Sequence, residues 1–266
     1  MTDNRNGSGT VRWNGLDLAV EDRGEGRVLL LVHGFPLDRA LWRHLSGALP
    51  GWRTIAPDLS GFGRSTVPDG GYSTARWADE LAGLLEAMEV DRAVVCGLSM
   101  GGYIALEFAA RHRARMAGLV LMDTRAEADT AEGRAGRDEM IALVRTAGVG
   151  AVADRLLPRL LAPATMVRTP EVVQEVRAMI ERCPVDGVVG ALAAMRDRPD
   201  RSALLPTLTG MPVLVVVGAE DAITPESTAR AMADVIPGAR LEVIAGAGHL
   251  PPLERPEAVA GVMAEQ

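Results

Sequence analysis

Short apolar segments alternate with longer segments of helical periodicity over residues 27–122, and this alternation constrains the fold more than any other feature of the chain. The apolar segments are rich in Val, Ile and Leu and end in Gly or Asp, which is typical of parallel strands buried on both faces. The pattern predicts an α/β fold with a mostly parallel central sheet and helices on both faces. The expected strands are 27–32, 53–56, 92–96 and 117–122, preceded by an edge strand at 16–20, and the expected helices are 39–49, 73–88 and 99–111.

The pattern changes between residues 125 and 205. This segment is rich in Ala, Arg, Glu and Met, shows no convincing strand, and is divided by five prolines into about four expected helices. Strand character returns at residues 212–217 and 240–244, with a helix between them and another from Pro256. We therefore expect one core domain, formed by residues 1–124 and 206–266, that is interrupted by a helical cap insertion at 125–205.

Composition excludes several kinds of chemistry. The 28 basic side chains of the Lys+Arg total are all arginine, which excludes Schiff-base chemistry on an internal lysine and phosphate loops of the GxxxxGK[ST] kind. With four histidines and two cysteines in 266 residues, zinc ribbons and cysteine-rich scaffolds are excluded as well. We expect no metal and no cofactor, and we expect Cys96 and Cys183 to be reduced and buried.

The net charge of −7 disfavours nucleic acids and anionic membranes as partners. The first ten residues are polar and do not form a signal sequence, and no segment approaches the roughly 18 apolar residues of a membrane helix. These features predict a cytoplasmic protein that acts on a small molecule. They leave its oligomeric state unknown.

A GxSxG motif, Gly97-Leu98-Ser99-Met100-Gly101, joins the expected strand 92–96 to a helix. In this strand–turn–helix setting the serine hydroxyl stands on a sharp turn at the N-terminus of the helix, where backbone N–H groups face developing negative charge. The glycines on either side leave room for the turn. Ser99 is therefore the candidate nucleophile.

A serine nucleophile needs a base, and the base needs an acid that orients it. His249 lies in a glycine-rich loop directly after strand 240–244, which puts an imidazole at the carboxyl edge of the sheet. After the preceding strand, Glu220 and Asp221 are both candidate acids, and Asp123 after strand 117–122 is a third. We expect His44 and His112 to be solvated or to cap a helix.

The chain resembles α/β-hydrolase fold enzymes that carry a helical cap. The resemblance extends from His33-Gly34-Phe35-Pro36 through the turn at Ser99 to the C-terminal His249, and the order Ser, acid, His is the one this family uses. Residues 96–102 and 119–124 resemble bacterial carboxylesterases and 3-oxoadipate enol-lactonases in particular.

This resemblance implies specific roles. It selects Asp221 as the catalytic acid, because Asp follows Gly by three residues and precedes Thr-Pro, and it makes Glu220 a surface charge. It also implies that the Phe35 and Met100 backbone N–H groups form the oxyanion hole and that His33 braces the oxyanion loop. The proline that follows Phe35 resembles the one in the corresponding loop of cofactor-free haloperoxidases and perhydrolases. This resemblance implies a weak perhydrolase activity.

The residues and the resemblance together predict a serine hydrolase that cleaves carboxylic esters of small to medium size, with an enol-lactonase-like lactonase as the alternative. A non-catalytic ligand receptor on the same fold is the alternative from a different class. A lactonase needs a group that holds an anionic substrate, and the candidates are Arg134, Arg137, Arg145 and Arg155. Four insertion methionines are candidates for an apolar acyl pocket, with ordinary helix packing as their default role: Met140, Met166, Met179 and Met195. A structural turn, with Asp58 paired to Arg64, is expected at residues 58–65.

Overall fold

An eight-stranded, mostly parallel sheet forms the centre of the protein in a computed structural model that describes residues 7–264. The strand order is β1-β2-β4-β3-β5-β6-β7-β8; the β1–β2 and β2–β4 pairs are antiparallel and the other pairs are parallel. The predicted α/β fold is confirmed. The strands are β1 Gly7–Trp13, β2 Leu16–Gly24, β3 Arg27–Val32, β4 Trp52–Pro57, β5 Ala93–Leu98, β6 Met116–Met122, β7 Val213–Gly218 and β8 Arg240–Ile244.

The prediction of an edge strand at residues 16–20 was wrong in its place and length. This segment belongs to β2, which lies inside the sheet between β1 and β4, and the edge strand is β1. Buried positions are absent from β1, where half-buried and exposed residues alternate along the strand, so its sequence lacks the apolar run of a core strand. β1 forms a strand because it pairs with β2, although its own sequence lacks the pattern of a buried strand.

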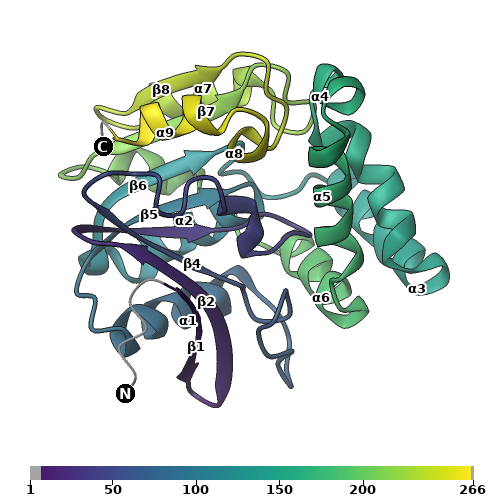
Figure 1. Ribbon diagram of the computed structural model, residues 1–266, viewed down its shortest axis with the longest axis horizontal. Helices are drawn as coiled ribbons and strands as arrows, with labels where there is room; N and C mark the ends of the chain where they lie inside the picture. The colour runs from purple at the N-terminus through teal and green to yellow at the C-terminus, as the bar shows by residue number, and fades with distance from the viewer. Residues whose placement is uncertain (1–6, 265–266) are drawn as a thin grey trace.

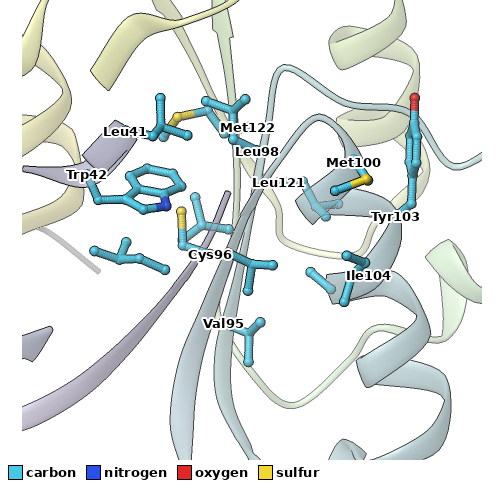
Figure 2. Packing of buried hydrophobic residues seen from close by; sticks show 14 of the residues in the cluster. Leu41, Trp42, Val95, Cys96, Leu98, Met100, Tyr103, Ile104, Leu121 and Met122 are labelled. Atoms are coloured by element: carbon cyan, nitrogen blue, oxygen red, sulfur yellow. The ribbon is translucent and has the colours of Figure 1, made fainter. Parts of the chain in front are cut away.

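Helices cover both faces of the sheet. On one side of β5 and β6, Met100, Tyr103 and Ile104 of α2 fill the core, and on the other side Leu41 and Trp42 do so (Figure 2). Ser73 caps α1, since its Oγ accepts a hydrogen bond from the Arg76 amide at 3.1 Å. The helices of this core are α1 Thr74–Ala87, α2 Met100–Arg111, α7 Glu226–Val235, α8 Pro251–Glu254 and α9 Pro256–Ala264, with 3-10 turns at Arg113–Arg115 and Ser202–Thr207.

The helix predicted at residues 39–49 is replaced by a single 3-10 turn, η1, at Arg39–Trp42, followed by irregular turns. Gly47, which has a φ of 78°, interrupts any longer helix here. The apolar residues of the segment are nevertheless buried: Leu41, Trp42, Leu45 and Leu49. The spacing of these residues therefore predicted correctly that they are buried, but the helix that it also predicted was wrong.

Four helices form an insertion that stands at one end of the sheet (Figure 1): α3 Ala131–Leu160, α4 Pro163–Arg168, α5 Pro170–Glu181 and α6 Val185–Arg196. Their number agrees with the prediction, whereas the boundaries 125 and 205 stay a prediction. Non-helical backbone at Gly148, with φ 77° and ψ 179°, divides α3 into two arms. Each arm contributes residues to the cavity described below.

The order of the parallel strands sets the order of the loops at their carboxyl ends. Because β3, β5, β6, β7 and β8 are neighbours in that order, the loops that begin at His33, Ser99, Asp123, Ala219 and Ala245 lie side by side. Ligands of open α/β sheets bind beyond the carboxyl ends of the strands. The topology thus assembles the candidate site residues at one edge.

Cys96 and Cys183 are free and buried, as expected. Burial raises the pKa of both thiols, so they behave as small apolar side chains. Among the helices of residues 7–264, none combines the length and the apolar character that crossing a membrane requires.

Candidate active site

Ser99 stands on a strained turn between β5 and α2. Its backbone adopts φ 54° and ψ −113°, a conformation that residues with a side chain rarely adopt. The turn closes because two glycines permit close backbone contacts: a Cβ on Gly97 would lie 2.1 Å from the Gly101 carbonyl oxygen, and one on Gly101 would lie 2.2 Å from that of Val32. The GxSxG spacing is therefore a steric requirement of this fold.

The loop after β3 packs against this turn. A Cβ on Gly34 would lie 3.3 Å from the Ser99 Cβ, which leaves the next residue, Phe35, beside the serine. On the other side, Met100 opens α2, so its N–H belongs to the first helical turn, where amides have no acceptor within the helix. The Phe35–Pro36 peptide bond is cis.

His33 braces this loop, as predicted. Its Nδ1 donates to the Gly34 carbonyl oxygen at 2.9 Å, and its Nε2 accepts from the Leu59 amide at 3.0 Å. Burial lowers the pKa of the His33 imidazole, which keeps the ring neutral and suits this pair of hydrogen bonds. His44 and His112 lie elsewhere: His44 is exposed beside Arg43, and His112 bonds Asp79 at 2.7 Å.

His249 and Asp221 form a buried hydrogen-bonded pair. The His249 Nδ1 donates to the Asp221 Oδ2 at 2.8 Å, which leaves Nε2 without a proton and able to act as a base. The same carboxylate accepts the Thr224 hydroxyl at 2.6 Å and the Ile223 and Thr224 amides at 2.7 and 3.1 Å. Burial alone would raise the pKa of Asp221, but these bonds and the neighbouring imidazole lower it to about 2.

Glu254 anchors the His249 loop to the insertion. Its Oε1 accepts the Gly248 amide at 2.8 Å, while its Oε2 accepts the Ala162 amide at 2.8 Å and the Thr165 hydroxyl at 2.6 Å. The His249 amide also donates to the Leu160 carbonyl oxygen at 2.9 Å. The position of the imidazole thus depends on the insertion as well as on the sheet.

Ser99 and His249 share a cavity of about 350 Å³ between the sheet edge and the insertion. Phe35 and Tyr103 line it from the core, and both arms of α3 and helix α6 line it from the insertion. This volume falls at the lower end of the range of small-molecule sites.

A family model described as alpha/beta hydrolase fold matches residues 27–256. The chain belongs to the alpha/beta hydrolase fold family. A thermophilic esterase from Thermogutta terrifontis, solved with malate bound, is 43% identical with a TM-score of 0.92 and 97% of each chain covered. The enol-lactonase from Burkholderia xenovorans LB400 is 27% identical with a TM-score of 0.89, covering 97% of this chain and 98% of that one. A pimeloyl-[acyl-carrier protein] methyl ester esterase from Aromatoleum aromaticum is 32% identical over 86% of this chain and 93% of its own.

Arginines and methionines of the insertion divide between the cavity of this hydrolase and other surroundings. Of the residues considered from the sequence, Arg137, Arg155, Met140 and Met195 line the cavity. The others, which are Arg134, Arg145, Met166 and Met179, lie outside that lining. Four residues of the site were not predicted from the sequence. Tyr103 and Arg159 line the cavity, Thr224 bonds the Asp221 carboxylate, and Glu254 anchors the His249 loop through partners distant in sequence.

Asp58 does pair with Arg64, but through the Arg64 backbone amide, at 2.8 Å, and not through its guanidinium. The ion pair of Asp58 is formed with Arg39. A Cβ on Gly63, whose φ is 53°, would lie 2.1 Å from the Asp58 carboxylate, so this turn depends on glycine. The segment forms a structural turn, as expected, but the cation that pairs with Asp58 is Arg39 and not Arg64.

Asp123, the alternative acid, lies beside the pair in this hydrolase. Asp123, Asp221 and His249 each place one polar atom within 4.8 Å of the other two. Asp123 Oδ1 accepts the Gly218 amide at 2.8 Å, and no donor among residues 7–264 bonds its buried Oδ2. Burial, and then the charge of Asp221, raise the pKa of Asp123 well above its usual value. Asp123 therefore holds its proton to a higher pH than an exposed aspartate does.

The Asp123→Asn substitution is expected to stabilise the protein increasingly as pH rises above about 4, the ordinary carboxyl range. The folded state keeps a proton that the unfolded state loses above its ordinary pKa, so wild-type stability decreases with pH over this window. Asparagine cannot ionise, which removes that contribution to the slope. Urea unfolding at several pH values measures how the free energy of unfolding changes with pH. The matched control is Glu220→Gln at an exposed carboxylate. Identical slopes for wild type and Asp123→Asn would contradict a raised pKa of Asp123.

Proposed function

We propose that this protein is a serine carboxylesterase that hydrolyses esters of small to medium size through an acyl-enzyme. The observation that carries the proposal is the 2.8 Å hydrogen bond between His249 and Asp221, together with the cavity that His249 shares with Ser99. Membership of a hydrolase family and the 43% identical esterase support an ester as the substrate.

In the first half of the reaction, the Ser99 Oγ attacks the ester carbonyl carbon while the His249 Nε2 takes the hydroxyl proton. The carbonyl oxygen becomes an oxyanion, which accepts hydrogen bonds from the Phe35 and Met100 amides. Asp221 stabilises the imidazolium and holds its tautomer. The intermediate collapses as the C–O bond breaks and His249 gives its proton to the departing alcohol.

In the second half, His249 takes a proton from water, and the resulting hydroxide attacks the acyl-enzyme carbon. A second oxyanion forms in the same amide pair. Its collapse breaks the bond to the Ser99 Oγ, which recovers its proton from His249, and the carboxylic acid leaves. The scheme uses only side chains, two backbone amides and water.

A lactonase is the second candidate function. The observation that favours it is the likeness to the Burkholderia enol-lactonase at a TM-score of 0.89. A lactone is an internal ester, so the same groups would open it, with the alcohol kept in the acyl-enzyme. Perhydrolysis, expected from Pro36, stays a prediction.

A fluorophosphonate probe and one substrate panel test the proposal. The probe should label wild type at Ser99 and leave Ser99→Ala unlabelled; absence of labelling would instead favour a non-catalytic ligand receptor. The panel contains p-nitrophenyl esters of graded acyl length, simple lactones and an enol-lactone, each with Ser99→Ala as the blank. A preference in kcat/KM of several hundredfold for the enol-lactone would reverse the order of the two candidates.

A further inference from the structure

Arg159 is an arginine of the cavity wall without a protein partner. It lies in the last turn of α3 and lines the cavity that holds Ser99 and His249. Among residues 7–264, no hydrogen bond, ion pair or ring contact engages its guanidinium. A guanidinium stays charged at neutral pH and offers a planar set of N–H donors. Arg159 therefore has donors available for a ligand.

The other arginines of this wall differ, because their guanidinium groups are already engaged. Their partners are the Asp129 carboxylate for Arg137 (3.0 Å), the Glu139 carboxylate for Arg155 (3.3 Å) and the Ile223 carbonyl oxygen for Arg125 (2.7 Å). Arg137 shares its acid with the buried Arg198, which bonds the second oxygen of Asp129 at 2.6 Å. Both oxygens of Asp129 are thus already bonded to other cations.

The charge of the cavity wall opposes that of the whole chain. Four arginines line it against two acids, Asp129 and Glu132, which gives a wall charge of +2 in a protein of net charge −7. A cavity with walls of one sign concentrates small ligands of the other sign. The site is therefore electrostatically suited to a small anion.

Arg159 is adjacent in sequence to a residue that contacts the His249 loop. The next residue, Leu160, accepts the His249 amide on its carbonyl oxygen at 2.9 Å, so the last turn of α3 contacts the loop that carries the base. The remaining wall is apolar and is formed in part by Leu156, Leu192 and Met195. A substrate that fits has a carbonyl at Ser99, a short alkyl chain and an anionic end.

We propose that this site prefers monoesters of short dicarboxylic acids and that Arg159 binds their free carboxylate. The guanidinium and the carboxylate can form two parallel N–H···O bonds, which hold the substrate at a fixed distance from Ser99. This proposal rests on the esterase function proposed above, with Arg159 as a specificity-determining residue and not as a member of the reacting set.

Paired esters test the specificity. The p-nitrophenyl monoester of glutaric acid and p-nitrophenyl valerate have the same chain length and differ in the terminal carboxylate. Arg159→Met should lower kcat/KM for the glutarate ester about 10- to 100-fold, the worth of a hydrogen-bonded charge pair, and change the valerate rate by less than about twofold. The control is Arg145→Met, an exposed arginine on the same helix outside the cavity lining, which should change neither rate. An equal loss on both esters, or no loss on either, would overturn the proposal.

A binding experiment separates failure of this proposal from failure of the esterase function. In the Ser99→Ala protein, which cannot turn over substrate, added glutarate should raise Tm, and the rise should disappear in Ser99→Ala/Arg159→Met. No rise in the Ser99→Ala protein, or the same rise in both, would reject the carboxylate site. If glutarate binds through Arg159 but wild type hydrolyses neither ester, the carboxylate site stands and the esterase function is what fails.

Discussion

Replacing Ser99 with alanine is expected to lower kcat on the order of 10⁶-fold, because the group that forms the acyl-enzyme is lost. The His249–Asp221 pair and the amides beside the serine remain, yet no other nucleophile is within their reach in the proposed mechanism. Hydrolysis of p-nitrophenyl butyrate, followed at high enzyme concentration, measures the loss. Ser227→Ala, at an exposed serine of α7, is the matched control and should leave activity unchanged. Residual activity above about one part in a hundred would remove Ser99 from the nucleophile role.

Substitutions of Ser99 should also measure how much the strained backbone of the turn lowers the free energy of unfolding. The conformation of Ser99, φ 54° and ψ −113°, is the mirror image of extended backbone, so glycine adopts it without strain while serine and alanine do not. Ser99→Gly should therefore be inactive, like Ser99→Ala, but more stable than Ser99→Ala by about 1 kcal/mol. Urea unfolding of the two variants measures this difference. Equal stability would mean that the surrounding contacts hold the turn without strain.

The second large effect is expected at the acid: Asp221→Asn should lower kcat on the order of 10⁴-fold. The asparagine amide would turn an N–H toward the His249 Nδ1, which favours the tautomer that carries its proton on Nε2 and cannot act as a base. Because the packing volume barely changes, the folded structure should persist. The expected signature is a large fall in kcat with KM little changed, and Glu220→Gln, next to it in sequence and exposed, should show neither effect.

Asp123 supplies the outcome that would contradict this assignment. If Asp221→Asn kept most of its activity and only Asp221→Asn/Asp123→Asn lost it, Asp123 would be the acid that orients His249. The stability of the Asp221→Asn protein adds an independent readout. The pKa of Asp221 is lowered to about 2, so wild type loses stability as pH falls from the usual carboxyl range toward that value, and the variant should lack this contribution.

Local sequence predicted the parallel strands of the sheet, because each carries Val, Ile or Leu residues within its own short segment. The strand expected at residues 27–32 coincides with β3 and that at 240–244 with β8, and the nucleophile turn follows β5 as expected. Strand β1 and turn η1 were missed or misjudged because their structure depends on neighbours: β1 on its pairing with β2, and η1 on the burial of its side chains under the sheet.

The candidate site divides in the same way. Ser99, Asp221 and His249 each lie in the segment that follows a parallel strand, so the topology of the sheet was enough to bring them to one edge. Glu254 and Arg159 carry no such local mark. The role of Glu254 arises from contacts about 90 positions away in the chain, and that of Arg159 from the acids that other arginines occupy.

The bonds of Glu254 have a consequence for recombination between related enzymes. The segment 160–165 supplies the Leu160 carbonyl, the Ala162 amide and the Thr165 hydroxyl that hold the His249 loop. A chimera that exchanges the whole insertion for that of a relative would thus receive a foreign anchor for His249 along with a new cavity wall. Crossover points placed on either side of residues 160–165, so that this segment stays with its own Glu254, should yield active hybrids more often. In a chimera, residues 160–165 should therefore come from the same parent as the sheet.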